Sequence, residues 1–510
     1  ALTQLNLPLV EFSVEHPRDE SHGDYSVNVA MVLGKKIPET KKSSTEPHKS
    51  PIDLASEIAS CIHAVAQSGK DILIDKVEVA KPGFINFYLK QDFFFNEVKE
   101  AIKVGYGANQ TLAGQKTMVE FTDPNPFKEF HIGHLMSNTI GESLCRVFEM
   151  CGAEVRRANY QGDVGLHVAK SVWGMMQALK NKNIKLEDIA NNSLQERQRF
   201  MGKAYADGAQ KYETDEVIKS EIISINKQIY AQFLRPTGSD PVGPIGAEDA
   251  ERVREFYRVG RDWSLEYFEV IYRRLGTKFD EYFFESETGQ VGIEVVKEGL
   301  DKGILEYGES GAIIFNSAKY GLHTRVFCNK LGLPTYEGKE LGLAKIKWER
   351  YAYDKSYVVT AKEIDEYFKV LLKVMTLLYP EMGTRTTHLS HGVMKLTSGK
   401  MSSRTGKIVA GETLLDELKG VVLAKMGERE IDNKDMVADQ VAVAALKYSV
   451  LKQAVGGDIV YEPDKMTNLE GNTGPFVQYA YARASSILRK FDVDFTKDGS
   501  LRDILQGSVL

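Results

Sequence analysis

Two histidines and a glycine stand close together in NPFKEFHIGH, residues 125–134. His131 and His134 are three residues apart, with Gly133 between them, directly after a turn that contains two prolines. At the start of a helix, free backbone N–H groups and the helix dipole favour an anion, and a glycine lets a ligand approach the backbone. Two imidazoles on the same side of such a turn can donate hydrogen bonds to phosphate oxygens, above all in a transition state. The cluster therefore predicts a phosphate site rather than two surface histidines or a zinc site, for which no third ligand stands nearby.

A second polar cluster lies in HLSHGVMKLTSGKMSSRTGKIV, residues 388–409. A loop rich in glycine and serine presents Lys400, Ser402, Ser403 and Arg404. Cations and hydroxyls on a mobile loop suit closing over a triphosphate and stabilising the pyrophosphate that leaves. Standing alone, the stretch would be interpreted as a solvated basic loop, so its meaning depends on the histidine cluster.

The histidines need a strand, a turn and a helix to hold them in place. Residues 117–122, TMVEFT, are predicted to form a short apolar strand, and DPNPF to form the turn. Apolar residues then recur at spacings of three and four from Met136 to Cys151, on one face of a helix that Gly152 ends. Residues 153–160, AEVRRANY, follow as the next strand. This order is typical of a parallel sheet covered by helices, so we expect an α/β, Rossmann-like domain.

The pattern divides the chain into three regions. Residues 1–112 are predicted to form a small α+β domain, because two helical segments precede the alternating strand pair KVEVAKPGFINFYL. Residues 113–425 are predicted to form the Rossmann-like domain, with a largely helical and charged insertion around residues 172–325. Residues 426–510 are predicted to form a helical region.

Composition excludes several classes of protein. With 510 residues the chain is too long for a single core, and its net charge is −6. That charge argues against a protein that coats nucleic acid, although it permits a local basic face. No apolar run is long enough to span a bilayer, and the first residues lack the layout of a secretory signal. The four cysteines include no CxxC pair, so we expect reduced thiols in a cytoplasmic protein without a membrane partner.

HIGH and KMSSR together resemble the HIGH and KMSKS signatures of class I aminoacyl-tRNA synthetases. Longer segments resemble the arginyl-tRNA synthetase family in that family's order: HGDYSVNVAMVL, KPGFINFYL, VEFTDPN, NYQGDVGLH, GKMSSRTG and GNTGPFVQYAYARASSILRK. The resemblance implies an arginine–tRNA ligase, which forms arginyl-adenylate from L-arginine and ATP with Mg²⁺ and transfers arginine to the 3′-terminal ribose of tRNA(Arg). It also implies that the N-terminal domain contacts tRNA and that an anticodon-binding domain begins at about residue 474. Because the family places a helical bundle there, we expect the chain to be truncated.

The resemblance implies that ATP is bound by His131, Gly133, His134, Lys400, Ser402 and Ser403. Ser403 stands where the KMSKS signature has its second lysine. An upstream lysine at the position of Lys128 supplies the cation in arginyl-tRNA synthetases that lack this second lysine. We therefore expect His131, His134, Lys128 and Lys400 as catalytic residues. We further expect no protein-bound metal, and a monomer.

The resemblance implies an arginine site formed by Glu120, Asp123, Asn125, His134, Tyr336, Glu340 and Glu285. Tyr336 and Glu340 are four residues apart on an expected helix, and so share one face. A carboxylate suits a guanidinium because it accepts two parallel hydrogen bonds, and an aromatic ring can lie beside that plane. Asn125 is expected to hold the α-amino group. Ile364 stands where the family usually has a glutamine that contacts the amino acid, so one contact must come from elsewhere, from Glu363 or Asp123.

Two other functions remain open on the sequence alone. A nucleotidyltransferase outside translation also uses an HxGH turn, but it leaves the N-terminal region and the QYAYARASSILRK segment unexplained. A non-catalytic tRNA-binding paralogue is disfavoured by the intact HIGH sequence with Lys128 and Lys400 in place. Arginine-dependent exchange between ATP and pyrophosphate, with and without tRNA, would separate these functions.

Overall fold

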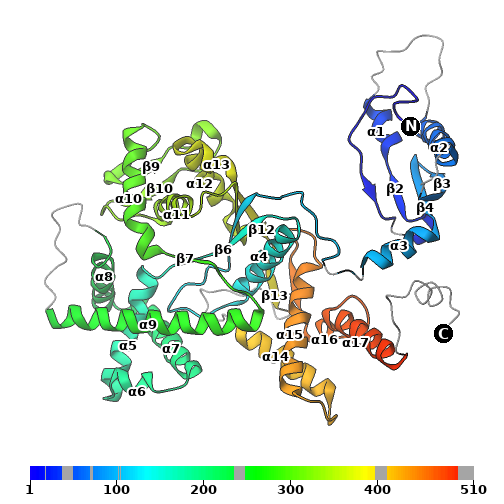
Figure 1. The fold of residues 1–510 in the computed structure, drawn as a ribbon. Helices are drawn as coiled ribbons and strands as arrows, with labels where there is room; N and C mark the ends of the chain where they lie inside the picture. The colour runs from blue at the N-terminus through cyan, green and yellow to red at the C-terminus, as the bar shows by residue number, and fades with distance from the viewer. Residues whose placement is uncertain are drawn as a thin grey trace. The chain divides into compact units, whose positions relative to one another are not determined.

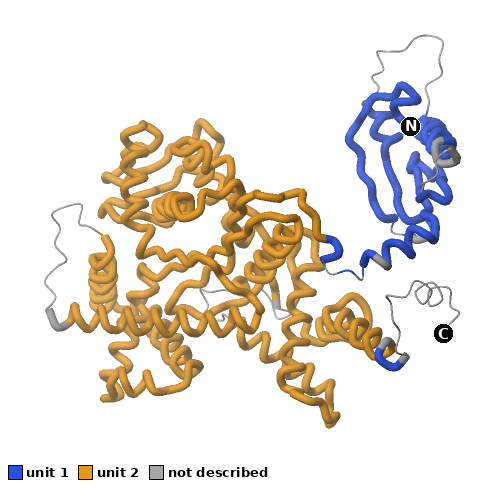
Figure 2. Tube along the Cα trace, in the orientation of Figure 1, with its two compact units in different colours: residues 1–107, 489–510 blue, residues 108–488 orange. Residues whose placement is uncertain are grey.

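A computed structural model describes residues 1–17, 19–36, 50–68, 73–101, 103, 105–234, 247–396 and 410–491. The chain divides into two compact units, residues 1–107 together with 489–510, and residues 108–488 (Figure 2). Each unit has its own buried apolar cluster, so each is described by itself.

The smaller unit is an antiparallel sheet covered by helices. Its strands have the order β1-β2-β4-β3 and are β1 (Val14–Glu15), β2 (Tyr25–Val27), β3 (Ile74–Ala80) and β4 (Phe84–Leu89). Its helices are the 3₁₀ turn η1 (Glu20–His22), α1 (Val29–Lys36), α2 (Pro51–Ser68) and α3 (Gln91–Ala101). Leu33 and Ile58 pack with Ile85 in its core. The α+β class predicted for this region, with β3 and β4 paired as a hairpin, is confirmed.

A five-stranded parallel sheet forms the centre of the larger unit. Its strands are β5 (Lys116–Phe121), β6 (Glu154–Gln161), β7 (Glu281–Phe284), β11 (Lys355–Ala361) and β12 (Thr386–His391). They lie in the order β12-β11-β5-β6-β7, and every neighbouring pair is parallel. This is the strand order of a Rossmann-like sheet, which reverses between β5 and β11, and ligands of such sheets bind beyond the carboxyl ends of the strands at that point. The predicted fold class is confirmed.

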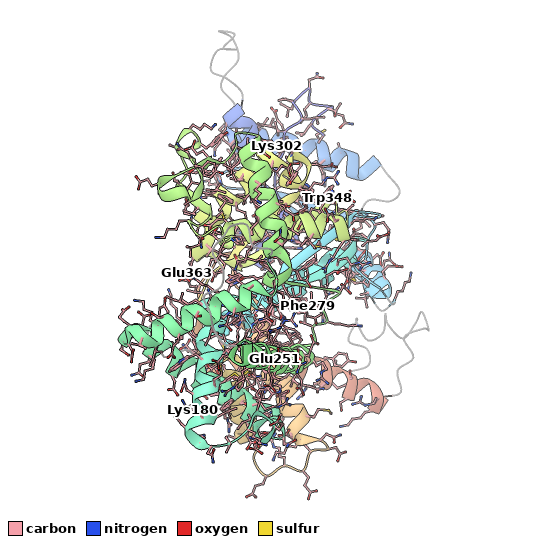
Figure 3. The ribbon with its side chains drawn as sticks, turned by 90° about the vertical axis from the view of Figure 1, so that its left-hand side faces the viewer. Lys180, Glu251, Phe279, Lys302, Trp348 and Glu363 are labelled. Atoms are coloured by element: carbon pink, nitrogen blue, oxygen red, sulfur yellow. The ribbon has the colours of Figure 1, made fainter. Side chains whose placement is uncertain are left out.

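Helices cover both faces of this sheet. One face packs on α4 (Ile132–Met150), α14 (Gly411–Met426), α15 (Lys434–Leu451) and the last turns of α9 (Ala247–Leu275). The other packs on α10 (Glu285–Asp301), α11 (Tyr336–Arg350) and α12 (Asp365–Leu378), which α13 (Pro380–Arg385) follows (Figure 1). In the side view of Figure 3, Lys302 after α10 and Trp348 of α11 lie above Phe279, whereas Lys180 lies below it.

Most of the expected insertion is helical and has its own apolar core. It contains α5 (Leu166–Lys182), α6 (Leu186–Ala190), α7 (Leu194–Thr214), α8 (Glu216–Ala231) and the long α9. The range 172–325 nevertheless includes β7, a strand of the main sheet, which has only four residues and therefore shows no periodicity in the sequence. A small antiparallel sheet follows α10, with β8 (Glu306–Tyr307), β9 (Ile313–Phe315) and β10 (Arg325–Cys328). The 3₁₀ turns described in the larger unit are η3 (Glu309–Gly311), η4 (Ala318–Tyr320) and η5 (Lys362–Ile364).

The C-terminal region is helical in its described part, as predicted. After α14 and α15 come α16 (Pro463–Met466) and α17 (Gly474–Phe491). One short strand was not expected: β14 (Ile459–Tyr461) pairs in parallel with β13 (Met394–Leu396), just before the serine-rich loop. Among the helices that the structure describes, none is long and apolar enough to cross a membrane.

Candidate active site

Helix α4 begins at the two histidines, and their side chains cap it. The backbone N–H of Gly133 donates to Nδ1 of His131, and the N–H of His131 donates to Nδ1 of His134, both at 3.1 Å. The two rings stack with their centroids 3.6 Å apart. Because each Nδ1 accepts a hydrogen bond, each neutral ring carries its proton on Nε2, which remains a donor. The capping geometry thus selects the tautomer that can donate to a phosphate.

Both imidazoles are held in the neutral form. Burial, with Lys128 nearby, lowers the pKa of His131 from 6.5 to about 4. Burial and then the neighbouring His131 and Lys128 lower the pKa of His134 well below 6.5. At neutral pH these residues are therefore uncharged hydrogen-bond donors and bring no positive charge to the site.

The turn that precedes α4 has an unusual backbone. Thr122, Asp123 and Phe127 have φ values of 80°, 47° and 67°, in a region that residues with side chains rarely adopt. Tertiary hydrogen bonds hold the turn there: the N–H of Thr122 donates to Ser137 Oγ and that of Phe127 donates to Ser264 Oγ, both at 2.9 Å. Strained backbone maintained in this way is common at functional sites.

A cavity of about 590 Å³ opens beyond the carboxyl ends of β5, β6 and β11. Every predicted arginine-site residue lines it: Glu120, Asp123, Asn125, His134, Glu285, Tyr336 and Glu340. His131 and Gly133 line the same cavity, which joins the predicted phosphate site to the predicted arginine site. Tyr336 and Glu340 come from the first two turns of α11, so their spacing of four does place them on one face.

Five carboxyl groups lie around the cavity, and three of them have basic partners. The ion pairs are Glu120 with Lys347 at 2.8 Å, Glu285 with Lys339 at 2.5 Å and Glu337 with Arg325 at 3.4 Å. The first two pairs are buried at both ends. Each of these carboxylates is therefore compensated inside the protein.

The other two carboxyl groups, of Asp123 and Glu340, form no ion pair with any residue that the structure describes. Burial, and then the nearby Glu120, raises the pKa of each of them well above its ordinary value. Asp123 accepts one hydrogen bond, from the N–H of Tyr160 at 2.8 Å. A ligand with two cationic groups would compensate both carboxylates, whereas an anionic or neutral ligand would leave them buried without a partner.

Lys128 does not line the cavity. It is partly buried, and burial lowers the pKa of its ammonium, which the nearby Glu285 opposes and Lys170 reinforces. Within the described part of the chain, the ammonium forms no ion pair. Its positive charge helps to lower the pKa of both His131 and His134.

Lys400, Ser402 and Ser403 lie outside the described residues, so their placement stays a prediction. The residues that follow their loop are described. Ala410 forms an antiparallel bridge with His131, and the N–H of Gly411 donates to the carbonyl of Phe130 at 2.6 Å. Ala410 and Gly411, which follow the serine-rich loop, are thus joined to the histidine turn.

Several cavity residues were not found in the sequence. Arg325, Tyr367 and His391 come from β10, α12 and β12, and no local spacing connects them to the other site residues. Gly162 lay within the segment NYQGDVGLH but was not singled out. A Cβ added to Gly162 would meet Oδ1 of Asn125 at 2.1 Å, so a glycine is required for Asn125 to approach.

The sheet order, the histidine-capped helix and the cavity at the strand ends fit a class I aminoacyl-tRNA synthetase, and comparison with known families shows that class. The family profile "tRNA synthetases class I (R), catalytic domain" matches residues 97–462. A second profile, "Arginyl tRNA synthetase N terminal domain", matches residues 1–89. The chain belongs to the arginyl-tRNA synthetase family.

Individual proteins show the same relationship. The arginine–tRNA ligase of Treponema pallidum is 29% identical over 514 residues, which covers 98% of this chain and 80% of that protein. That of Treponema denticola is 30% identical over 457 residues, covering 88% and 74%. The solved arginyl-tRNA synthetase of Plasmodium falciparum has the same fold, with a TM-score of 0.71 at 20% identity, covering 98% of this chain and 81% of that one. The Thermus thermophilus enzyme superimposes with a TM-score of 0.69 at 21% identity, covering 96% and 80%.

Proposed function

We propose that this protein is an ATP-dependent arginine–tRNA ligase, which forms arginyl-adenylate and transfers the arginyl group to tRNA(Arg). The observation that carries the proposal is the pair of uncompensated carboxyl groups, Asp123 and Glu340, in the cavity that the capping histidines also line. Arginine has two cationic groups, and ATP has the phosphates that the histidines suit. A nucleotidyltransferase outside translation gives no reason for the two carboxylates, and a non-catalytic paralogue gives none for the donor tautomer of the histidines.

The guanidinium of arginine is assigned to Glu340. A carboxylate accepts two parallel hydrogen bonds from a guanidinium, and the ring of Tyr336 lies on the same face of α11. The α-ammonium is assigned to Asp123, together with Asn125 and Glu120. Ile364 lines the cavity but cannot bond through its side chain, so Asp123 takes the contact that a glutamine there would make.

In the activation step, a carboxylate oxygen of arginine bonds to the α-phosphorus of Mg²⁺–ATP. The bond from that phosphorus to the bridging oxygen breaks, and pyrophosphate leaves with its electron pair. The Nε2–H groups of His131 and His134 donate to phosphate oxygens, while Lys128, Lys400 and the hydroxyls of Ser402 and Ser403 stabilise the charge that develops. The terminal ribose hydroxyl of the tRNA then attacks the arginyl carbonyl and AMP leaves. Positioning and charge stabilisation suffice, so no side-chain nucleophile is needed.

The regions of the chain receive corresponding roles. Residues 1–112 are assigned to tRNA contact, which the match of residues 1–89 to the family's N-terminal domain supports. Residues 113–425 carry the chemistry, and residues 426–510 include the start of an anticodon-binding domain. The four cysteines are free, which supports a reducing compartment, the cytoplasm. We assign a monomer as the active form.

Arginine-dependent ATP–pyrophosphate exchange and tRNA charging test the proposal directly. Both reactions are expected with arginine and not with lysine, because a carboxylate fits a forked cation better than a point charge. Glu340→Gln keeps the size of the side chain but removes its charge. It should lower kcat/KM for arginine by about 10²-fold or more, with the KM for ATP nearly unchanged. Equal use of lysine by the parent protein, or an unaffected Glu340→Gln variant, would refute the proposal.

A further inference from the structure

Asp163 is a buried carboxylate that the mechanism above does not use. It lies two residues after β6 and has no exposed surface. One oxygen, Oδ1, accepts from the N–H of Ser286 at 2.9 Å. The other, Oδ2, accepts from Ser286 Oγ at 2.7 Å, from Arg261 Nε at 2.9 Å and from the hydroxyl of Tyr257 at 3.3 Å. Such a completely bonded buried carboxylate holds its neighbours in one arrangement.

Asp163 caps helix α10 from a different element. The residue before this helix, Phe284, makes no side-chain capping bond, and Ser286 is the second residue of the helix. The carboxylate of Asp163 satisfies the free N–H of Ser286 and is favoured by the helix dipole. Glu285, the first residue of α10, lines the arginine cavity. The direction in which Glu285 enters the cavity therefore depends on Asp163.

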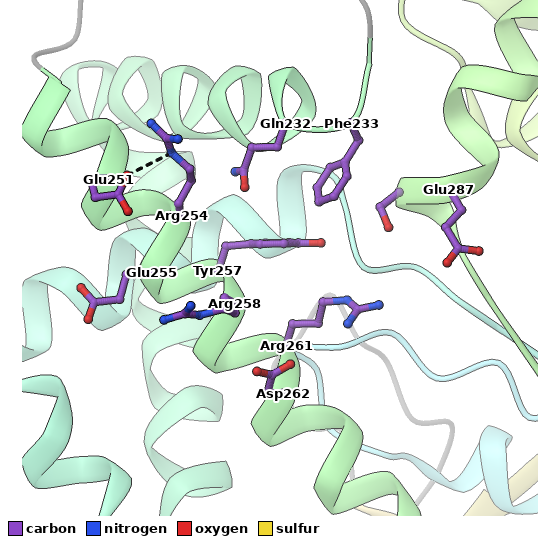
Figure 4. Close-up of a pocket in the computed structure, with 11 residues that line it drawn as sticks. Gln232, Phe233, Glu251, Arg254, Glu255, Tyr257, Arg258, Arg261, Asp262 and Glu287 are labelled. Atoms are coloured by element: carbon purple, nitrogen blue, oxygen red, sulfur yellow. Dashed lines mark ion pairs between the residues drawn. The ribbon is translucent and has the colours of Figure 1, made fainter.

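Arg261, which belongs to the helical insertion, contacts the same region at the start of α10. Its guanidinium lies 4.1 Å from the centre of the Phe284 ring, in addition to its bond to Asp163. Tyr257 and Arg261 extend from α9 toward the start of α10 (Figure 4). They line a hollow of about 800 Å³. The hollow itself specifies no ligand, because its arginines are outnumbered by the carboxylates around them.

The arginine cavity is narrow at Gly162, next to Asp163. A Cβ at Gly162, the neighbour of Asp163, would lie 2.1 Å from Asn125 Oδ1 and 3.2 Å from Glu285 Oε1. The two walls of the cavity thus approach each other over Gly162. A small shift in the first turn of α10 would change the distance between Asn125 and Glu285, both of which face the substrate.

We propose that Asp163 and Arg261 are positioning residues for arginine. They hold the start of α10, and by this route the helical insertion sets the affinity for arginine of a cavity that neither residue lines. This inference rests on the proposed function. Loss of Arg261 leaves Asp163 buried without a cation, so the first turn of α10 must rearrange to solvate or rebond it. When Asp163→Asn is combined with the loss of Arg261, no buried charge remains, so the first turn of α10 need not rearrange.

The test is steady-state ATP–pyrophosphate exchange by the full chain, with tRNA present. Arg261→Met and Asp163→Asn should each raise the KM for arginine by about tenfold or more, with the KM for ATP within about twofold. The double variant should be less impaired than Arg261→Met, because no buried charge is left unpaired. Arg261→Lys, which keeps a cation, should recover part of the loss. If Arg261→Met does not fold, Asp163→Asn, which keeps the size and one acceptor, decides.

Arg197→Met is the matched control. Arg197 binds Glu266 of α9 through both terminal nitrogens, at 3.0 and 3.3 Å, but neither residue contacts the start of α10. This variant should lower Tm without raising the KM for arginine. If the Asp163 and Arg261 variants behave like this control, or shift both KM values equally, the inference is overturned and the proposed function stands. If the parent protein shows no arginine-dependent exchange, the proposed function fails and the inference fails with it.

Discussion

At the residue scale, His131 combines two properties that depend on each other. Its Nδ1 accepts the N–H of Gly133 and so caps α4, and this acceptor role leaves the proton of the neutral ring on Nε2. Protonation would turn the capping acceptor into a donor that faces a backbone N–H. The low pKa of His131, about 4, therefore protects the cap at the start of the helix.

This shift predicts how stability depends on pH. The pKa of His131 is about 4 in the folded chain and 6.5 ordinarily, so the unfolded chain binds more protons between these pH values. The contribution of His131 to the unfolding free energy should be fully present above pH 6.5. It should be lost as the pH falls toward 4, by at most about 1.4 kcal/mol per pH unit. His131→Asn keeps a capping oxygen but cannot titrate. Urea unfolding across this window should show a steeper loss in the parent than in the variant, and parallel curves would contradict the prediction.

Lys128 is expected to replace the lysine that is missing at Ser403. What matters is one positive charge against the phosphates in the transition state, so the two positions should compensate for each other. Lys128→Ala should lower the activation rate by roughly 10²–10³-fold, with a much smaller effect on the KM for arginine. Adding Ser403→Lys should recover a good part of that loss, whereas Ser403→Lys alone should gain little. Exchange kinetics of the three variants decide the matter, because a double variant no better than Lys128→Ala would mean that the lysines act differently.

At the element scale, the close packing of α10 against α11 sets where Tyr336 and Glu340 lie. A Cβ at Gly342 of α11 would meet the carbonyl of Thr288 at 2.3 Å and the N of Gly292 at 2.6 Å. Gly342→Ala must therefore push the two helices apart. It should cost about 1–3 kcal/mol of stability and raise the KM for arginine.

Gly420→Ala is the control for this prediction. Gly420 also lies inside a helix, α14, but a Cβ there would meet nothing within 4 Å. That variant should be more stable by about 0.5–1 kcal/mol, since alanine is the better helix former, and should keep the parent KM. Thermal unfolding and arginine titration of both variants provide the comparison. An unchanged KM in Gly342→Ala would show that the spacing of α10 and α11 does not govern the arginine site.

At the scale of the whole molecule, folding and chemistry are separable between the two units. All of the described residues that line the cavity belong to residues 108–488, and the described core of the smaller unit contains none of them. Leu33 is fully buried in that smaller core. Leu33→Ala should lower the stability of residues 1–107 by about 2–5 kcal/mol. Calorimetry should show a lower Tm for the unfolding transition of the smaller unit and an unchanged Tm for that of the larger unit. Arginine-dependent exchange should proceed at the parent rate. A shift of both transitions would indicate one cooperative unit.

The sequence by itself determined the features that depend on neighbours along the chain. The histidine turn, the helix after it and the Tyr336–Glu340 face follow from spacings of three and four residues, which the helix geometry converts directly into position. Alternation revealed β3 and β4 in the same way. The four-residue β7 and three-residue β14 were missed because segments so short carry no periodic signal.

Only the tertiary structure decided which charges meet. Lys347 neutralises Glu120 across 227 residues, and Lys339 neutralises Glu285 across 54, so Glu340 is left to a ligand although all three carboxylates look alike in the sequence. Asp163 and Arg261, 98 residues apart, belong to the same category. The physical reason is that an ion pair depends on distance and burial, and both are set by how the sheet, α9 and α11 pack together rather than by any local pattern.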